Sequence, residues 1–164
     1  MVSVRFSQRE RGVRPAGWAP APQTQLAEEL IALGVDDLAK YRLAELFSTS
    51  PGIVRDATTC AEGLGLHSVE LTDALLEQMA ASGILVSPLG VQRFGRLYLW
   101  AANTERCRRL HWLLGLSRLP AYRPLVLRTL AARSFRRAEE RGRSAAARRE
   151  DEVAGAVERV CCRA

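Results

Sequence analysis

The segment from Leu64 to Leu85, LGLHSVELTDALLEQMAASGIL, constrains the fold more than any other part of the chain. Gly65 is suited to end one helix in the left-handed conformation, and Ser68 is suited to cap the next helix. Helical spacing then predicts an inward-facing apolar stripe, made of Leu71, Leu75, Leu76 and Met79. Gly83 ends this second helix. The pattern therefore predicts two helices joined by a tight turn.

Two helices are expected before this pair. The first runs from Thr24 to Ile31, and Gly34 follows its end. The second begins at Asp36 or Asp37 and ends before Pro51, after which Ile53 and Val54 are suited to a very short strand. Asp56 is then the expected cap of the helix that ends at Gly65, and Cys60 falls on its apolar face as a small buried residue.

A hairpin is expected after the pair. The run ILVS predicts one strand, PLGVQ its turn and RFGRLYLW the returning strand. Alternation in the returning strand divides its large side chains between two faces. Phe94, Tyr98 and Trp100 share one face, and Leu97 and Leu99 share the other.

The last third of the chain is expected to be helical. Residues 103–117 predict an amphipathic helix that is capped by Asn103 or Thr104. Pro124 suits the first turn of a further helix. The apolar stripe of that helix is expected to contain Leu127, Leu130, Ala131 and Phe135. Ser144 is expected to cap a separate last helix.

Residues 36–100 resemble a winged helix-turn-helix domain, of the broad kind found in bacterial MarR-like and ArsR-like regulators. The segments that carry the resemblance are LAELFSTSPG, TTCAEGLGL, LLEQMAASGIL and RLYLW. The resemblance implies a mainly α fold with a small β-hairpin, in which extra C-terminal helices follow the winged helix-turn-helix core. It divides the chain into a flexible basic arm (1–23), the winged domain (24–102) and a helical extension (103–164). The fold serves many tasks, so it limits the function only loosely.

The positive charge of the chain lies in one late segment. Residues 1–117 have no net charge, residues 118–149 carry a net charge of +8 and residues 150–164 a net charge of −2. The basic block suits a polyanion or an acidic partner, and it equally suits a solvated helix face.

Catalytic and metal-binding patterns do not stand out. The chain has two histidines and four cysteines, and no C-x-x-C spacing. We expect neither an enzyme nor a bound cofactor or metal. No stretch is apolar enough to span a membrane, and cysteine usage favours a cytoplasmic protein.

The resemblance implies that the helix after Gly65 enters the major groove of double-stranded DNA. Hydrogen bonds to DNA are then expected from Ser68, Thr72 and Gln78. Acidic side chains on the same helix oppose the phosphates, namely Glu70, Asp73 and Glu77. Phosphate contacts are therefore expected from arginines elsewhere, namely Arg93 and Arg96 in the wing and Arg128, Arg133, Arg136 and Arg137 in the basic segment.

Two interpretations stay open. The first is a DNA-binding transcriptional regulator that forms a homodimer through its C-terminal helices. The residues expected at that dimer interface are Leu110, Trp112, Leu113, Leu127 and Leu130. The second is a winged-helix adaptor that binds a basic protein through the acidic helix 68–82, with Glu70, Asp73 and Glu77 as contacts and without sequence-specific DNA binding.

Overall fold

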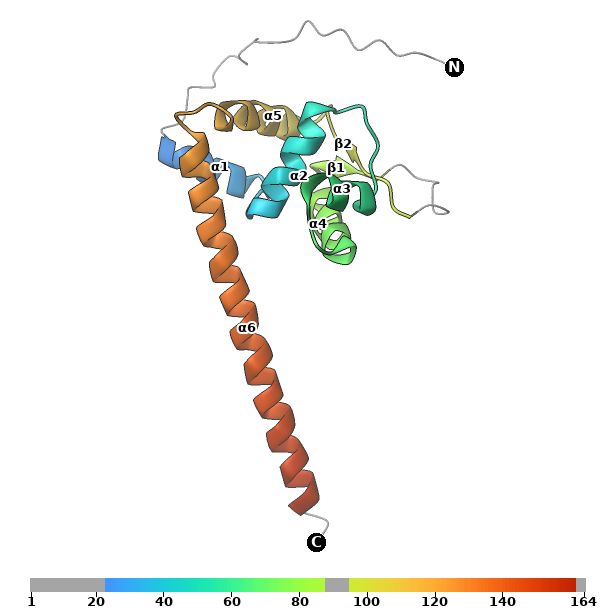
Figure 1. The fold of residues 1–164 in the computed structure, drawn as a ribbon, viewed down its shortest axis with the longest axis vertical. Coiled ribbons are helices and arrows are strands. Elements are labelled where there is room, and N and C mark those ends of the chain that lie inside the picture. Colours follow the sequence, from blue (N-terminus) through green and yellow to red (C-terminus); the bar gives the residue numbers. More distant parts are fainter. Residues whose placement is uncertain (1–22, 88–94, 162–164) are drawn as a thin grey trace, which may run out of the picture.

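The structure is a computed structural model that describes residues 23–87 and 95–161. Side chains are described for residues 25–87, 95–140, 142 and 143. In these ranges the protein is mainly α, with six helices and a two-stranded antiparallel sheet (Figure 1). Five helices and the sheet form a body, and the C-terminal helix extends from it (Figure 1). Among the described residues, no helix is long and apolar enough to cross a membrane.

The first four helices begin close to the positions that the sequence predicts. They are α1 (Gln23–Ala32), α2 (Leu38–Thr49), α3 (Ala57–Leu64) and α4 (Val69–Ala81). The side chains of Asp37, Asp56 and Ser68 each accept a backbone N–H from the first turn of α2, α3 and α4. Gly65 ends α3 with φ 63°, as predicted, and this left-handed conformation suits a residue without a side chain.

The sheet is shorter than expected. It pairs β1 (Leu85–Val86) with β2 (Leu99–Trp100). The strand expected at Ile53 and Val54 is replaced by a single bridge between Arg55 and Tyr98. Tyr98 and Trp100 share a burial class, as the alternation predicts for one face, and both are buried, whereas Leu97 and Leu99 are half-buried. The expected turn and Phe94 lie outside the described residues.

The C-terminal region contains two helices instead of three. They are α5 (Glu105–Ser117), capped by Thr104, and α6 (Arg123–Cys161). The prediction of a separate helix from Ser144 is wrong, because α6 runs through that position for 39 residues. Alanine and arginine dominate residues 141–149 and favour helix, and the single Gly142 lowers helix stability by only about 1 kcal/mol.

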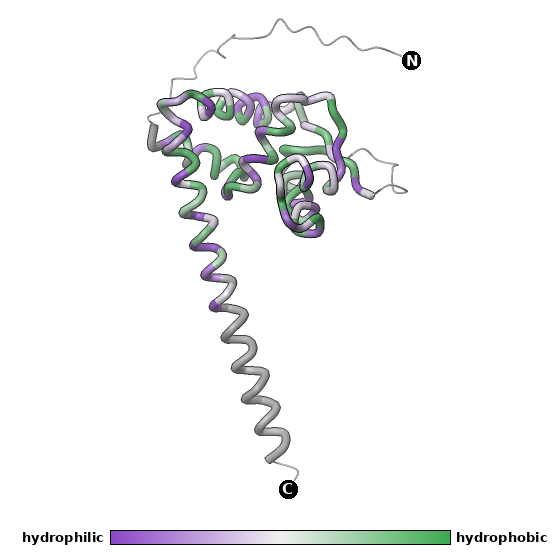
Figure 2. The backbone as a smooth tube through the Cα atoms, viewed as in Figure 1, coloured by the Kyte–Doolittle hydropathy of each residue, from purple (hydrophilic) through white to green (hydrophobic). Residues whose placement is uncertain are grey.

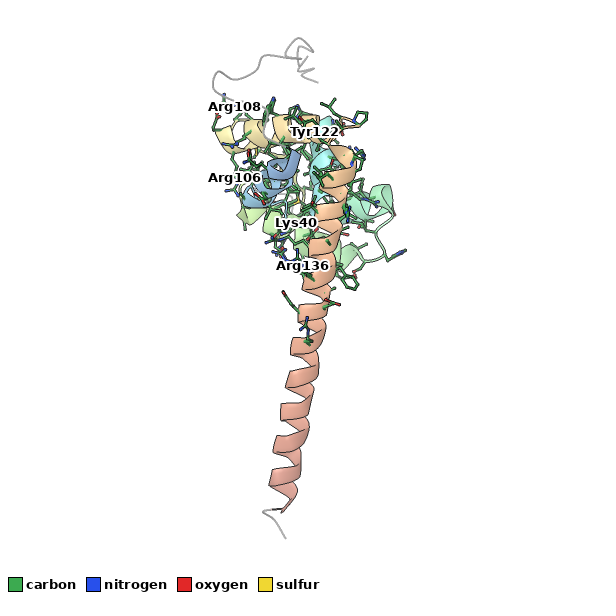
Figure 3. The ribbon with its side chains drawn as sticks, turned by 90° about the vertical axis from the view of Figure 1, so that its left-hand side faces the viewer. Lys40, Arg106, Arg108, Tyr122 and Arg136 are labelled. Atoms are coloured by element: carbon green, nitrogen blue, oxygen red, sulfur yellow. The ribbon has the colours of Figure 1, made fainter. Side chains whose placement is uncertain are left out.

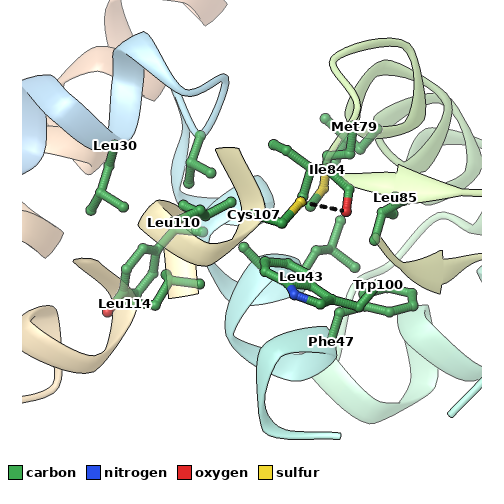
Figure 4. Packing of buried hydrophobic residues seen from close by; sticks show 14 of the residues in the cluster. Leu30, Leu43, Phe47, Met79, Ile84, Leu85, Trp100, Cys107, Leu110 and Leu114 are labelled. Carbon is green, nitrogen blue, oxygen red and sulfur yellow. Dashed lines mark hydrogen bonds between the residues drawn. The ribbon is translucent and has the colours of Figure 1, made fainter. Parts of the chain in front are cut away.

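The hydrophobic core contains residues of all six helices and of the sheet; α2 and α4 pack on the sheet, whereas α5 and the start of α6 pack on α1 and α2 (Figure 4). Apolar positions recur in the body and in the first turns of α6 (Figure 2). The Cys107 thiol donates to the carbonyl oxygen of Ile84, 3.5 Å away (Figure 4). Cys60 is fully buried, which confirms that it is a core residue. Burial raises the pKa of the Cys60 thiol to about 11, so that this thiol stays protonated at neutral pH.

Candidate functional site on α4

The buried face of α4 differs by one position from the predicted face. Leu75, Leu76 and Met79 are buried as expected, whereas Leu71 is 57% exposed. Thr72 occupies the inward position instead, because residues 72, 76 and 79 follow the helical period toward α2 and α3. The Thr72 hydroxyl donates to the Ser68 carbonyl oxygen over 2.8 Å. The prediction that Thr72 contacts DNA is therefore wrong, since its side chain is only 1% exposed.

The outer face of α4 combines acidic, amide and apolar side chains. Its exposed residues include Val69, Glu70, Leu71, Glu77 and Gln78. The sequence of α4 contains neither lysine nor arginine. Gln78 is exposed, so the predicted contact of its side chain with DNA stays a prediction.

The hydroxyl of Ser68 caps the N-terminus of α4. It accepts the backbone N–H of Leu71 over 3.1 Å and donates to a carboxylate oxygen of Glu70 over 2.9 Å. Two hydrogen bonds lower the pKa of the Glu70 carboxyl: the larger effect comes from its own backbone N–H and the smaller one from the Ser68 hydroxyl. The first of the three predicted contact acids is thus part of the helix cap.

The other two acids of α4 connect this helix to the segment just before β2. The Tyr98 hydroxyl donates to Asp73 over 2.9 Å. Arg96, two residues earlier in the segment that leads into β2, forms an ion pair with Glu77. The side chains of residues 96 and 98 thus both reach α4. All three predicted contact acids consequently have partners within the chain.

Tyr98 is the residue of this site that the sequence reasoning missed as a functional contact. Burial raises its pKa to about 12, and the hydrogen bond to Asp73 acts in the same direction. The alternation predicts only that Tyr98 shares a face with Trp100, and no sequence pattern identifies Asp73 as the acceptor 25 residues away. The sequence does contain an acid on α4, Asp73, and an aromatic residue just before β2, Tyr98, and such a pair can form a hydrogen bond.

The predicted phosphate-binding arginines lie in different surroundings. Arg93 is outside the described residues, and Arg96 is exposed but paired with Glu77. On α6, Arg128 and Arg136 are exposed. Arg137 pairs with Asp36 over 2.6 Å, and the buried Nε of the half-buried Arg133 has no hydrogen-bond partner among the described residues. Of the five that the structure describes, Arg96 and Arg137 are therefore paired within the chain and Arg133 is half-buried.

The predicted dimer interface requires a correction. Leu110, Leu113 and Leu130 are fully buried in the core of a single chain, because α5 packs on α1 and α2 and α6 packs on α1. Trp112 and Leu127 are partly buried against the same core. These five side chains stabilise the body and do not form an accessible surface for a second copy.

The described residues contain no group of three His, Cys, Asp or Glu side chains that is placed to hold a metal ion. Comparisons of the chain with protein-family models, with curated proteins and with solved structures found no match.

Proposed function

We propose that the region from α2 to β2 is a winged helix-turn-helix domain, and that the protein binds double-stranded DNA as a transcriptional regulator. The observation that carries the proposal is the outer face of α4. This helix follows α3 after a tight turn at Gly65 and precedes a hairpin, while its face with Glu77 and Gln78 stays in solvent. A helix in this position suits the major groove.

The charge on α4 opposes DNA less than three acids in the sequence suggest. Arg96 offsets the charge of Glu77, and Asp73 is half-buried beneath the Tyr98 hydroxyl. Glu70 lies at the N-terminus of α4, where the helix dipole favours negative charge. The local repulsion of phosphate is therefore small, and base contacts are expected from Gln78 together with His67, which is exposed just ahead of the helix.

Phosphate contacts are expected from a small set of arginines. The wing supplies Arg93 and, when it is released from Glu77, Arg96. A measurable consequence is a moderate salt dependence, because each phosphate contact releases counterions. Two contacts predict that binding weakens about 12-fold between 50 and 200 mM salt.

The test is fluorescence anisotropy with random-sequence duplex DNA at several salt concentrations. Arg93→Ala should weaken binding to all sequences and reduce the log–log salt slope by about 0.9. The matched control is Arg108→Ala on α5, which lies across the body from α4 (Figures 1 and 3). Undetectable binding of the wild-type chain at the lowest salt would contradict the proposal.

A second candidate function has its own supporting observation. Leu71 is 57% exposed, and Glu70 and Gln78 are exposed beside it on α4. Such a surface suits an amphipathic, basic segment of another protein, as in an adaptor. Leu71→Arg separates the two functions, since the added positive charge should strengthen DNA binding and abolish capture of a basic peptide. Unchanged DNA affinity together with lost peptide binding would favour the adaptor.

A further inference from the structure

The first half of α6 uses one face to dock on the body. Val126 and Leu130 on this face are buried in the core. Further along, Ser134 Oγ accepts the backbone N–H of Leu38 over 3.1 Å, and Arg137 pairs with Asp36. Spacings of four, four and three residues keep these positions on one side of the helix. Beyond Arg137, α6 continues away from the other elements (Figure 1).

A second face of α6 is apolar and solvent-exposed. Ala131, Phe135, Ala138 and Gly142 follow spacings of four, three and four residues and are exposed. The Phe135 side chain is 66% exposed, which makes it the most exposed large apolar residue that the structure describes. At 100° per residue, this face lies roughly 110° around the helix from the body-facing side. The two faces are therefore distinct.

The same pattern continues along the rest of the helix. Positions separated by three or four residues are Ala131, Phe135, Ala138, Gly142, Ala146, Arg149, Val153, Ala156 and Val160. Eight of the nine are apolar or glycine, and Arg149 is the exception. We call these nine positions the α6 seam. An isolated helix in water is only marginally stable and is normally stabilised by packing an apolar face. The α6 seam is thus the surface that a partner helix would cover.

We propose that the α6 seam binds the α6 seam of a second copy in the antiparallel orientation. The spacing carries the first argument. Counted outward from the midpoint between Gly142 and Ala146, seam positions recur at nearly the same distances in both directions. Reversing one helix therefore places Gly142 opposite Ala146 and Phe135 opposite Val153. The spacing therefore permits the antiparallel orientation, and the distribution of charge decides between it and the parallel one.

Charge carries the second argument. The segment 118–149 has a net charge of +8, whereas the acids Glu150, Asp151 and Glu152 follow directly. In a parallel pair the two basic segments lie side by side, and so do the two acidic segments. In the antiparallel pair each acidic segment lies beside the basic half of the other helix, around Arg136. Opposite charges next to the seam favour this orientation.

The test of association is the mass of the full chain, measured by light scattering and sedimentation over a range of concentrations. The wild-type chain should be a dimer, and Phe135→Glu should weaken the dimer at least tenfold. Leu119→Glu is the matched control, because Leu119 is also an exposed apolar residue but lies outside α6. Circular dichroism checks that each variant keeps its folded body. A monomeric wild-type chain at concentrations on the order of 0.1 mM, or a Phe135→Glu variant that stays dimeric, would overturn the proposal.

Cross-linking tests the orientation separately. Ala131→Cys and Ala156→Cys variants are made with Cys161 and Cys162 changed to Ser. In the antiparallel register positions 131 and 156 of different copies are adjacent, so the disulfide forms only when the two variants are mixed. In a parallel pair each variant cross-links with itself and the mixture adds nothing. That second result would overturn the antiparallel arrangement. The inference does not depend on what α4 binds.

Discussion

The guanidinium of Arg137 on α6 lies 2.6 Å from the carboxylate of Asp36, the residue that precedes the cap of α2. The other oxygen of Asp36 accepts from Lys40 Nζ over 2.9 Å, and the Lys40 side chain is only 8% exposed. Lys40 lies beside α6 at this point (Figure 3). One carboxylate therefore joins the start of α2 to the middle of α6.

Replacing Asp36 should destabilise the protein. In Asp36→Ala the nearly buried Lys40 ammonium loses its acceptor, and Arg137 loses its pair. We expect the free energy of unfolding to fall by about 1–3 kcal/mol, as measured by urea denaturation. Glu105→Ala is the control, because its pair with Arg108 is exposed and should contribute below about 1 kcal/mol. Equal effects of the two substitutions would contradict this role for Asp36.

The same carboxylate predicts a pH dependence of stability. Burial raises the pKa of Asp36, but the hydrogen bonds and charges of Arg137 and Lys40 outweigh burial and leave the pKa lowered. The folded state therefore binds this proton less readily than the unfolded state. The stabilisation is fully present above the ordinary carboxyl pKa of about 4 and is lost as the pH falls through the lowered value. The stability difference between the wild-type chain and Asp36→Asn, measured by thermal unfolding, should shrink below pH 4.

The contact between Tyr98 and Asp73 should be visible in alkaline titration. The pKa of Tyr98 is raised to about 12, so stability that depends on the protonated hydroxyl is present below about pH 10 and is lost as the pH rises toward 12. Tyr98→Phe should remove one late transition in tyrosinate absorbance. It should also lower the free energy of unfolding by about 1 kcal/mol. An unchanged late transition would show that Tyr98 is not the group that titrates there.

The ion pair between Glu77 and Arg96 makes a prediction for DNA binding. Glu77→Gln removes one carboxylate from the outer face of α4 and releases Arg96 for phosphate. DNA affinity should rise several-fold at low salt, and the salt slope should steepen by about 0.9 for one added phosphate contact. The double variant Glu77→Gln with Arg96→Ala should lose most of this gain. Weaker DNA binding by Glu77→Gln would count against α4 as the DNA-facing helix.

Core and surface leucines should differ sharply in their contribution to stability. Leu130→Ala removes a fully buried side chain and should lower the free energy of unfolding by about 2–5 kcal/mol. Leu71→Ala, at an exposed position of α4, should change it by less than about 0.5 kcal/mol. Chemical denaturation of both variants measures the difference. Similar losses at the two positions would contradict the burial described for α4 and α6.

Local sequence signals predicted the elements well because their causes are local. The caps at Asp37, Asp56 and Ser68 each depend on a hydrogen bond to a residue three positions later. The left-handed Gly65 likewise depends on its own backbone. Such features can be derived from neighbouring residues, and the structure places them where the sequence predicted.

The errors concern relations between distant segments. Helical spacing alone does not decide whether Leu71 or Thr72 faces the core from α4, and in the structure Thr72 does. Leu110 and Leu130 belong to α5 and α6, and both were assigned to an interface between copies because their packing on α1 and α2 depends on contacts far apart in sequence. The contacts of Asp73 with Tyr98 and of Asp36 with Arg137 also join residues that are far apart in sequence, so local patterns do not predict them.

The length of α6 gives the docking contact at Asp36 a mechanical consequence. At about 1.5 Å per residue, the end of the helix at Cys161 lies about 36 Å beyond Arg137. A rotation of α6 by about 10° around this contact would move its tip by about 6 Å, so the helix is a lever that amplifies small changes in the body.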